Sequence, residues 1–282
     1  MILREPTKPE VWEQGAGFIG MCEHIARCAA ICYDSTPKKS GEAVEFVKRL
    51  IRMGHGRALE FGTVYVVYEG AIEPVDSGNR ELKHYISYDD GSAYTTMNLR
   101  TYLSGGMSNI STLERNWVEP MPSHPKRITI HYPAISRAIA DEFRTHTTLS
   151  TLMQSTRYVD KGKNGSITFI EPLWITQMRD NGDSETVANF ANVCENLELS
   201  YRALIECGRK RQEARDLLPL TISTEMVQCG FVGYKNEGWL NFLRLRTAPD
   251  AHPDARYMAE EVHRLINDCQ TKLPFEGWSS AG

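Results

Sequence analysis

The chain has 282 residues, of which 41% are hydrophobic and 24% are charged. This composition is typical of a globular protein with a substantial core and excludes a chain that is disordered throughout. The formal net charge of −4 excludes a polycation built to bind nucleic acid, but it leaves room for a local basic pocket for one phosphate.

The first half of the chain contains two predicted helices and one strand before a polar stretch. Apolar residues recur at helical spacing over 17–32 and 42–53, and the Gly-His-Gly turn at 54–56 ends the second helix. Residues 63–68 are β-branched and aromatic, which predicts a strand. A further helix is expected to start within 94–102, and the glycines and prolines of 105–126 predict irregular backbone. Residues 71–126 therefore form a polar excursion from the core.

The second half of the chain is mainly helical. Residues 127–131 and 166–170 are predicted strands, and Pro133 is expected in the first turn of a helix that continues to Phe143. Two long amphipathic helices are predicted, over 184–213 and 252–271. No boundary separates these elements, so we expect one domain over 1–282 of the α/β (α+β) class, a mixed sheet flanked by long helices.

Several classes of protein are excluded by patterns that the sequence lacks. No apolar run approaches the ~18–20 residues that span a bilayer, and the first ten residues have no apolar signal core. The seven cysteines include no CxxC pair, and no HExxH is present, so we expect neither a disulfide framework nor a metal site. We expect a reducing, cytoplasmic setting, no membrane contact and no nucleic-acid partner. The absence of a Walker loop, of GxGxxG after a strand and of GxSxG argues against three further common chemistries.

Three clusters could carry chemistry. Ser155, Thr156 and Arg157 combine hydroxyls with a planar guanidinium and could grip a phosphate, although such residues also cap turns. Arg215 follows a long helix, where it could bind an anion or simply interact with the helix dipole. Residues 239–246 alternate apolar and basic side chains, a pattern shared by a binding helix and by a helix with a solvated basic face.

Together these clusters resemble the flavin-dependent thymidylate synthases. Four segments carry the resemblance in the family's order, across roughly residues 25–260. They are residues 29–35; residues 54–61 with the strand after them; residues 136–158 with the strand at 167–170; and residues 214–219 with 241–252. The resemblance implies an α/β homotetramer with FAD between subunits and each site built from several subunits. It implies conversion of dUMP to dTMP, with NADPH reducing the flavin and methylenetetrahydrofolate supplying the carbon.

The resemblance also implies roles for individual residues. Arg246 is the expected catalytic residue, because its position contacts and polarises the uracil ring. The expected dUMP contacts are Ser155, Thr156, Arg157, Arg215, Arg246, Glu142 and Gln154. The expected FAD contacts are His55, Glu60, His146, Ser150, Asn241, Thr145 and Thr147.

The sequence departs from the family at the flavin-facing signature. The two arginines that flank the central histidine of that signature are Thr145 and Thr147 here, and only His146 remains. Threonine carries no charge, so Arg57 or Arg144 would have to supply it. The departures leave two alternatives open: the same scaffold with altered pyrimidine nucleotide chemistry, such as hydroxymethylation, or a nucleotide-binding relative without flavin.

Overall fold

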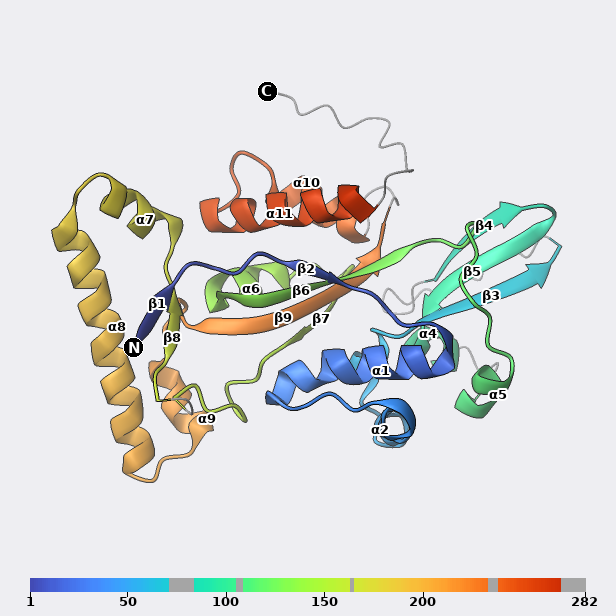
Figure 1. The fold of residues 1–282 in the computed structure, drawn as a ribbon, viewed down its shortest axis with the longest axis horizontal. Coiled ribbons are helices and arrows are strands. Elements are labelled where there is room, and N and C mark those ends of the chain that lie inside the picture. Colours follow the sequence, from blue (N-terminus) through green and yellow to red (C-terminus); the bar gives the residue numbers. More distant parts are fainter. Residues whose placement is uncertain (71–83, 105–108, 163–164, 233–237, 270–282) are drawn as a thin grey trace.

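The computed structural model describes residues 1–70, 84–104, 109–162, 165–232 and 238–269, in which helices and strands are mixed along the chain (Figure 1). The expected mixed α/β class is confirmed. The described strands are distributed over three sheets, two of them antiparallel and one a parallel pair. Among the described residues, none of the helices combines the length and the apolar character that crossing a membrane requires.

The central sheet has four antiparallel strands. Their order is β2 (Glu10–Trp12), β6 (Arg127–Ser136), β9 (Ser223–Phe231) and β7 (Ser150–Met153). Side chains alternate between the two faces of this sheet, as the pleat requires. Along β9, Met226 lies in the core on one face, whereas Val227 and Cys229 lie in a separate core on the other.

Helices cover both faces of the central sheet (Figure 1). One face packs against α6 (Arg137–Phe143), α10 (Gly238–Arg246) and α11 (Pro253–Cys269). The other face packs against α1 (Gly17–Ala30) and the short 3-10 helix Ile31–Tyr33, with α2 (Ser40–Arg52) behind them. The two helices predicted over 17–32 and 42–53 are therefore confirmed.

A second antiparallel sheet lies at one end of the molecule. Its order is β3 (Thr63–Glu69), β5 (Ser92–Asn98) and β4 (His84–Asp89). The strand expected at 63–68 is confirmed, but the helix expected to start within 94–102 is wrong up to Asn98. Asp90 and Gly91 both have positive φ, and this tight turn folds β5 back along β4. The helix α4 (Leu99–Ser104) begins only where the strand pairing ends.

The polar excursion at 71–126 is only partly described, since residues 71–83 and 105–108 lie outside the described residues. The remainder is more ordered than expected. It contains β4, β5, α4 and the helix α5 (Ile110–Arg115), which Asn109 caps by accepting a hydrogen bond from the backbone N–H of Thr112. Residues 117–126 have no helix or strand, in agreement with the prediction of irregular backbone there.

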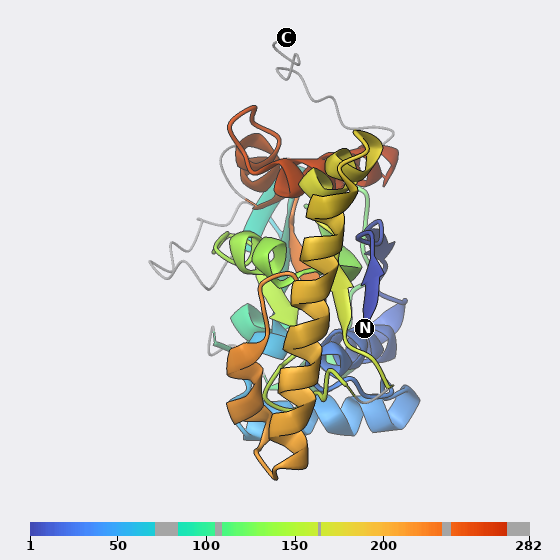
Figure 2. The same ribbon diagram turned by 90° about the vertical axis from the view of Figure 1, so that its left-hand side faces the viewer.

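The opposite end of the molecule contains the parallel pair β1 (Ile2–Arg4) and β8 (Thr168–Ile170), with α7 (Leu173–Asp180) and α8 (Ser184–Glu206) (Figure 2). The single helix predicted over 184–213 is wrong at its C-terminal end. Gly208 adopts a φ of +81°, which ends α8, and α9 (Arg211–Ala214) follows as a separate turn of helix. The helix predicted over 252–271 is confirmed as α11 within the described residues.

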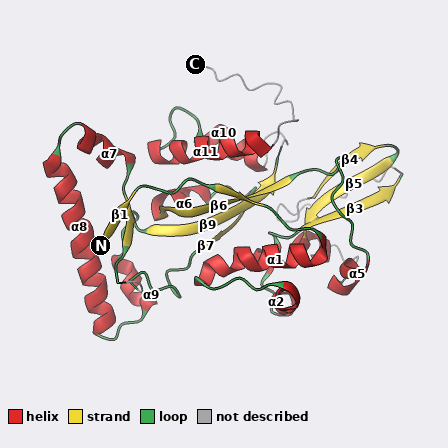
Figure 3. Ribbon diagram, viewed as in Figure 1, coloured by secondary structure: helices red, strands yellow, loops and turns green. Residues whose placement is uncertain are grey.

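Pro133 lies within β6, so its expected place in a helix is also wrong. Figure 3 draws β6 as a strand. The pairing of β6 with β9 shifts register between Tyr132 and Ile135, and a proline is tolerated at such an irregularity because no ladder hydrogen bond is needed there. The helix α6 begins after Ser136, whose hydroxyl oxygen accepts a hydrogen bond from the N–H of Ile139 at 3.3 Å. This start fixes the direction in which α6 presents Glu142 and the residues after it.

Candidate functional site

Arg246, the last residue of α10, is held by residues at the end of α6. Its Nε donates to His146 Nε2 at 2.7 Å, and one terminal nitrogen forms an ion pair with Glu142. The other terminal nitrogen donates to the Glu142 carbonyl oxygen at 3.1 Å and to Thr145 Oγ1 at 3.3 Å. The Arg246 side chain is only 19% exposed. Residues 239–246 are therefore not a helix with a simply solvated basic face.

His146 must be neutral to accept this hydrogen bond. Burial, and to a smaller extent the positive charge of Arg246, lower the pKa of His146 to about 4. The ring packs edge-on against Phe242 of α10, with the ring centroids 5.0 Å apart. An acceptor nitrogen, a carboxylate and a packed ring thus hold the guanidinium in one orientation.

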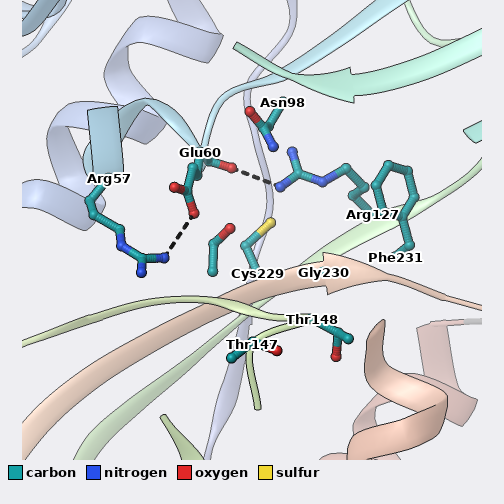
Figure 4. Close-up of a pocket in the computed structure, with 10 residues that line it drawn as sticks. Arg57, Glu60, Asn98, Arg127, Thr147, Thr148, Cys229, Gly230 and Phe231 are labelled. Atoms are coloured by element: carbon teal, nitrogen blue, oxygen red, sulfur yellow. Dashed lines mark hydrogen bonds and ion pairs between the residues drawn. The ribbon is translucent and has the colours of Figure 1, made fainter. Parts of the chain in front are cut away.

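A small pocket lies between the short helix α3 (Gly56–Leu59) and the edge of the central sheet where β6 begins and β9 ends (Figure 4). Its lining includes three of the residues expected to contact FAD, namely Glu60, Thr147 and Ser150. Two cationic side chains, Arg57 and Arg127, face the same pocket. The structure therefore places the positive charges of Arg57 and Arg127 across the pocket from Thr147.

The charged side chains near this pocket interact with Glu60. Glu60 is buried and pairs with Arg100 at 2.6 Å and with Arg57 at 3.5 Å. Arg127 donates to the Glu60 carbonyl oxygen at 2.7 Å and to Thr63 Oγ1 at 3.0 Å. The Glu60 carboxylate thus pairs with two guanidinium groups, whereas Arg127 contacts the backbone carbonyl of the same residue.

A wider groove of about 1620 Å³ adjoins this pocket, since Arg57 lines both. Small side chains of α1 and apolar side chains of α2 form its walls, and His55 lies at its edge. His55 is exposed, and it precedes α3 without capping it through its side chain. Of the two arginines considered as replacements for the signature charge, Arg57 lines the pocket. The other, Arg144, pairs with Asp141 at 2.8 Å and does not line it.

The candidate phosphate-binding residues form a turn directly after β7. The Oγ of Ser155 accepts a hydrogen bond from the Arg157 N–H at 3.2 Å, and the Ser155 N–H donates to the Cys32 carbonyl oxygen at 3.1 Å. The Arg157 guanidinium lies over the ring of Tyr158, 5.3 Å from its centroid, and makes no ion pair with a carboxylate of the described residues. Its charge is therefore available to a ligand.

The other expected site residues lie on other elements of the chain. Arg215 lies in the 3-10 helix Arg215–Leu217, where its side chain is 40% exposed and 4.0 Å from the Asp216 carboxylate. Asn241 lies on α10 and accepts a hydrogen bond from Arg244. No hydrogen bond or ion pair among the described residues joins the Arg246 cluster to the turn at 155–157. The roles assigned to all these residues stay predictions.

Sequence reasoning missed six residues of the pocket, three of which have side chains that can form strong hydrogen bonds. Arg127, Asn98 and Thr148 line it, yet they come from separate strands and loops and follow no local motif. The Thr148 hydroxyl and the Arg127 Nε are buried and have no hydrogen-bond partner among the described residues. Buried polar atoms of this kind cost free energy unless a ligand or water satisfies them, so both atoms point to a polar ligand.

Cys32 and His124 have structural roles. Burial raises the pKa of Cys32, which argues against a reactive thiolate there. His124 is buried between Tyr65 and Tyr94. No group of side chains suited to a metal ion occurs in the part of the chain that the structure describes.

Comparisons with known proteins agree with these features. The family model described as "Thymidylate synthase complementing protein" matches residues 122–270. A flavin-dependent thymidylate synthase of Thermus thermophilus is 32% identical over 88 residues, a match that covers 30% of this chain and only 30% of that protein.

Two solved structures also resemble the chain. One is thymidylate synthase X of Helicobacter pylori with FAD and dUMP, with a TM-score of 0.37 and 21% identity over 51% of this chain and 72% of the other. The second is the UMP/dUMP methylase PolB of Streptomyces cacaoi bound with 5-Br dUMP, with a TM-score of 0.45 and 13% identity over 95% of this chain and 93% of the other. The family match, which contains Arg246, the turn at 155–157 and the altered signature at 145–147, covers more than half of the chain. This chain therefore belongs to the Thy1 family, that of the flavin-dependent thymidylate synthases.

Proposed function

We propose that the protein methylates dUMP at C5 to give dTMP, with FAD as cofactor, NADPH as reductant and methylenetetrahydrofolate as carbon donor. Family membership supports the reaction class. The observation that carries the proposal is the Arg246 guanidinium, which Glu142 and a neutral His146 hold at the end of α10. A fixed cation of this kind can stabilise the negative charge on a ring carbonyl oxygen in the enolate whose C5 attacks the one-carbon unit.

The residues of the pocket fit a flavin nucleotide. The cationic side chains of Arg57 and Arg127 suit its phosphates. The Thr148 hydroxyl and the Arg127 Nε, which have no hydrogen-bond partner among the described residues, suit its hydrogen-bonding atoms. Glu60, Thr147 and Ser150 would hold the part in the pocket, and His55 would contact the part in the adjoining groove. When bound, the flavin would supply the hydride that completes the methyl group.

The nucleotide would be held by groups that offer complementary charge. Ser155, Thr156 and Arg157 would bind the phosphate, with Arg215 as a second cation. An unpaired carboxylate near the nucleotide would repel its phosphate. Glu142 forms an ion pair with Arg246, so the negative charge of Glu142 is already compensated.

We propose a homotetramer in which each site combines residues of different subunits. The cluster of Arg246, Glu142 and His146 shares no hydrogen bond or ion pair with the turn at 155–157 among the described residues, which supports this arrangement, because a second subunit could complete either one.

The test is a single reaction with mass analysis of the nucleotide. The purified protein with dUMP, FAD, NADPH and methylenetetrahydrofolate is expected to form dTMP, and Arg246→Ala should abolish it. Arg264→Ala is the matched control, because Arg264 pairs with Glu261 on the surface of α11. A parallel reaction with UMP would measure the preference for the sugar.

Other outcomes of the same test separate the alternatives. A hydroxymethyl product would assign the altered pyrimidine chemistry and contradict the methylation proposal. Binding of dUMP with no bound-flavin absorption spectrum would contradict it as well, and would favour the nucleotide-binding alternative.

A further inference from the structure

A largely buried lysine, Lys161, contacts the residue that precedes the turn of Ser155 and Arg157. The Lys161 ammonium donates to the Ser223 carbonyl oxygen at 2.8 Å and to the side-chain oxygen of Gln154. Within the described part of the chain it forms no ion pair with a carboxylate. A buried charge that is held only by neutral acceptors is costly, so such a residue calls for a functional reason.

Three charged groups face Lys161 from the elements around it. Asp34 follows the helix at 31–33, Arg137 begins α6, and Glu225 lies on β9. Burial lowers the pKa of Lys161 to about 8, Arg137 acts in the same direction, and the two carboxylates oppose the shift. Lys161 can thus lose its proton within a range in which the protein can be assayed.

The carboxylate on β9, that of Glu225, already has a partner. Glu225 lies 2.7 Å from His131 Nε2, and His131 Nδ1 lies 2.9 Å from Glu10. The His131 ring also stacks on Trp12, with the centroids 3.9 Å apart. Glu225 is therefore committed to this cluster, which explains why Lys161 interacts with an amide and a backbone carbonyl instead.

The two acceptors of Lys161 belong to two segments that the proposed function assigns to one ligand. Gln154 directly precedes Ser155, whereas Ser223 begins β9, a few residues after Arg215. A second cation joins the same segments, since Arg211 donates to the Tyr158 carbonyl oxygen at 2.8 Å. The Lys161 contacts thus connect the turn of Arg157 to the segment of Arg215.

We propose that protonated Lys161 is a positioning residue that holds the 154–157 turn in its phosphate-binding form against the start of β9. The inference rests on the proposed nucleotide binding at Ser155 and Arg157. When Lys161 loses its proton, the ammonium becomes an amine with one donor fewer and no charge, and the contact with Gln154 and Ser223 weakens.

Nucleotide affinity should therefore fall as the pH rises through about 8. At pH 9 a group with that pKa is protonated in about one molecule in eleven, so the dissociation constant of dUMP should rise ~10-fold between pH 7 and pH 9. The nucleotide phosphate, with a second pKa of ~6, stays dianionic across this range and does not cause the change.

The experiment is isothermal titration calorimetry of dUMP with the flavin-loaded protein at both pH values. Lys161→Arg keeps its charge at both, so its affinity should vary less than ~2-fold with pH, which also controls for titration of the nucleotide itself. Lys161→Met should bind weakly at both pH values. Lys8→Met removes a lysine that pairs with Glu261, far from the turn along the chain, and should behave as the unaltered protein.

Each outcome supports or contradicts the positioning role of Lys161. A wild-type affinity that does not change with pH, or a Lys161→Arg variant with the same pH dependence as wild type, would overturn the role of Lys161 and leave the proposed function standing. Failure of dUMP to bind the wild-type protein at either pH would overturn both. If Lys161→Met does not fold, the comparison of wild type with Lys161→Arg still gives the answer.

Discussion

Arg246 can only donate hydrogen bonds, and this property determines the chemistry of the residues around it. Its Nε–H points at His146 Nε2, so the histidine must be an acceptor there and must carry its one proton on Nδ1. A protonated His146 would set two cations against each other. The Arg246 cluster is therefore stable only while His146 is neutral.

We expect Arg246→Lys to lower kcat/KM for dUMP by ~10²–10³, because an ammonium cannot replace the forked donors that contact His146, Thr145 and Glu142. Steady-state kinetics would measure the loss. Arg264→Lys on α11 serves as the control, and activity in Arg246→Lys equal to that of the control would contradict the catalytic role.

Acid should destabilise the protein through two buried histidines. The pKa of His146 and that of His24 are both lowered to about 4, chiefly by burial. Because the unfolded chain takes up these protons near pH 6.5 and the folded chain does not, the free energy of unfolding falls from about pH 6.5 down to about pH 4.

Urea denaturation at pH 7 and pH 5 would measure the difference, for which we expect ~2 kcal/mol from each histidine. His146→Gln should remove about half of the effect, whereas His252→Gln, which alters an exposed histidine, should remove none. An equal free energy of unfolding at the two pH values would contradict the burial argument.

At the scale of elements, the start of α10 depends on a glycine. Gly238 has a φ of +54°, and a Cβ there would lie 2.3 Å from the Phe231 carbonyl oxygen. Because that neighbour is backbone, an added methyl group must displace the helix that carries Arg246. The conformation of one residue thus sets the position of the proposed catalytic group.

Gly238→Ala should therefore lower the free energy of unfolding by at least ~1 kcal/mol and reduce activity. Gly41→Ala in α2 is the matched control, because a Cβ there meets nothing within 4 Å and alanine favours helix. Thermal denaturation and turnover of both variants would test this. A Gly238→Ala variant as stable and active as Gly41→Ala would contradict the proposed constraint.

The long helices could be predicted from the sequence because their apolar spacing is local information. The central sheet could not be predicted, since β2 and β7 have three and four residues and are defined by their pairing with β6 and β9. Pro133 shows the same limit, because only the pairing with β9 reveals that a strand tolerates it.

The candidate site also contains residues that could be predicted from the sequence and residues that could not. Arg246, Glu142 and His146 could be named as site residues from the sequence, because the family resemblance includes all three. Arg57 was named from the sequence as a source of charge for the pocket, but Arg127 was not, because it lines the pocket only through a fold that brings α3 beside β6.

For the whole molecule, the dispersion of the candidate site leads to a test of shared subunits. Arg157→Ala and Arg246→Ala should each be inactive alone. If one site takes Arg157 from one subunit and Arg246 from another, mixed and reassembled subunits should regain about a quarter of the wild-type activity, because random pairing gives one intact site in four.

Light scattering would establish the number of subunits in the same samples. No recovery of activity after confirmed subunit exchange would contradict the shared site. Arg157→Ala mixed with Ser155→Ala is the control, since two changes in the same turn cannot complement each other.

The strand β7 separates two regions that this protein would use together. Ser150 lines the pocket at one end of the strand, and Ser155 begins the turn at the other, ~17 Å away for extended backbone. Inserting or deleting one residue between them would change that distance and reverse the face on which every later side chain lies. Across descendants of this gene, insertions should therefore accumulate in the surrounding loops, while the length of the segment from 150 to 155 stays constant.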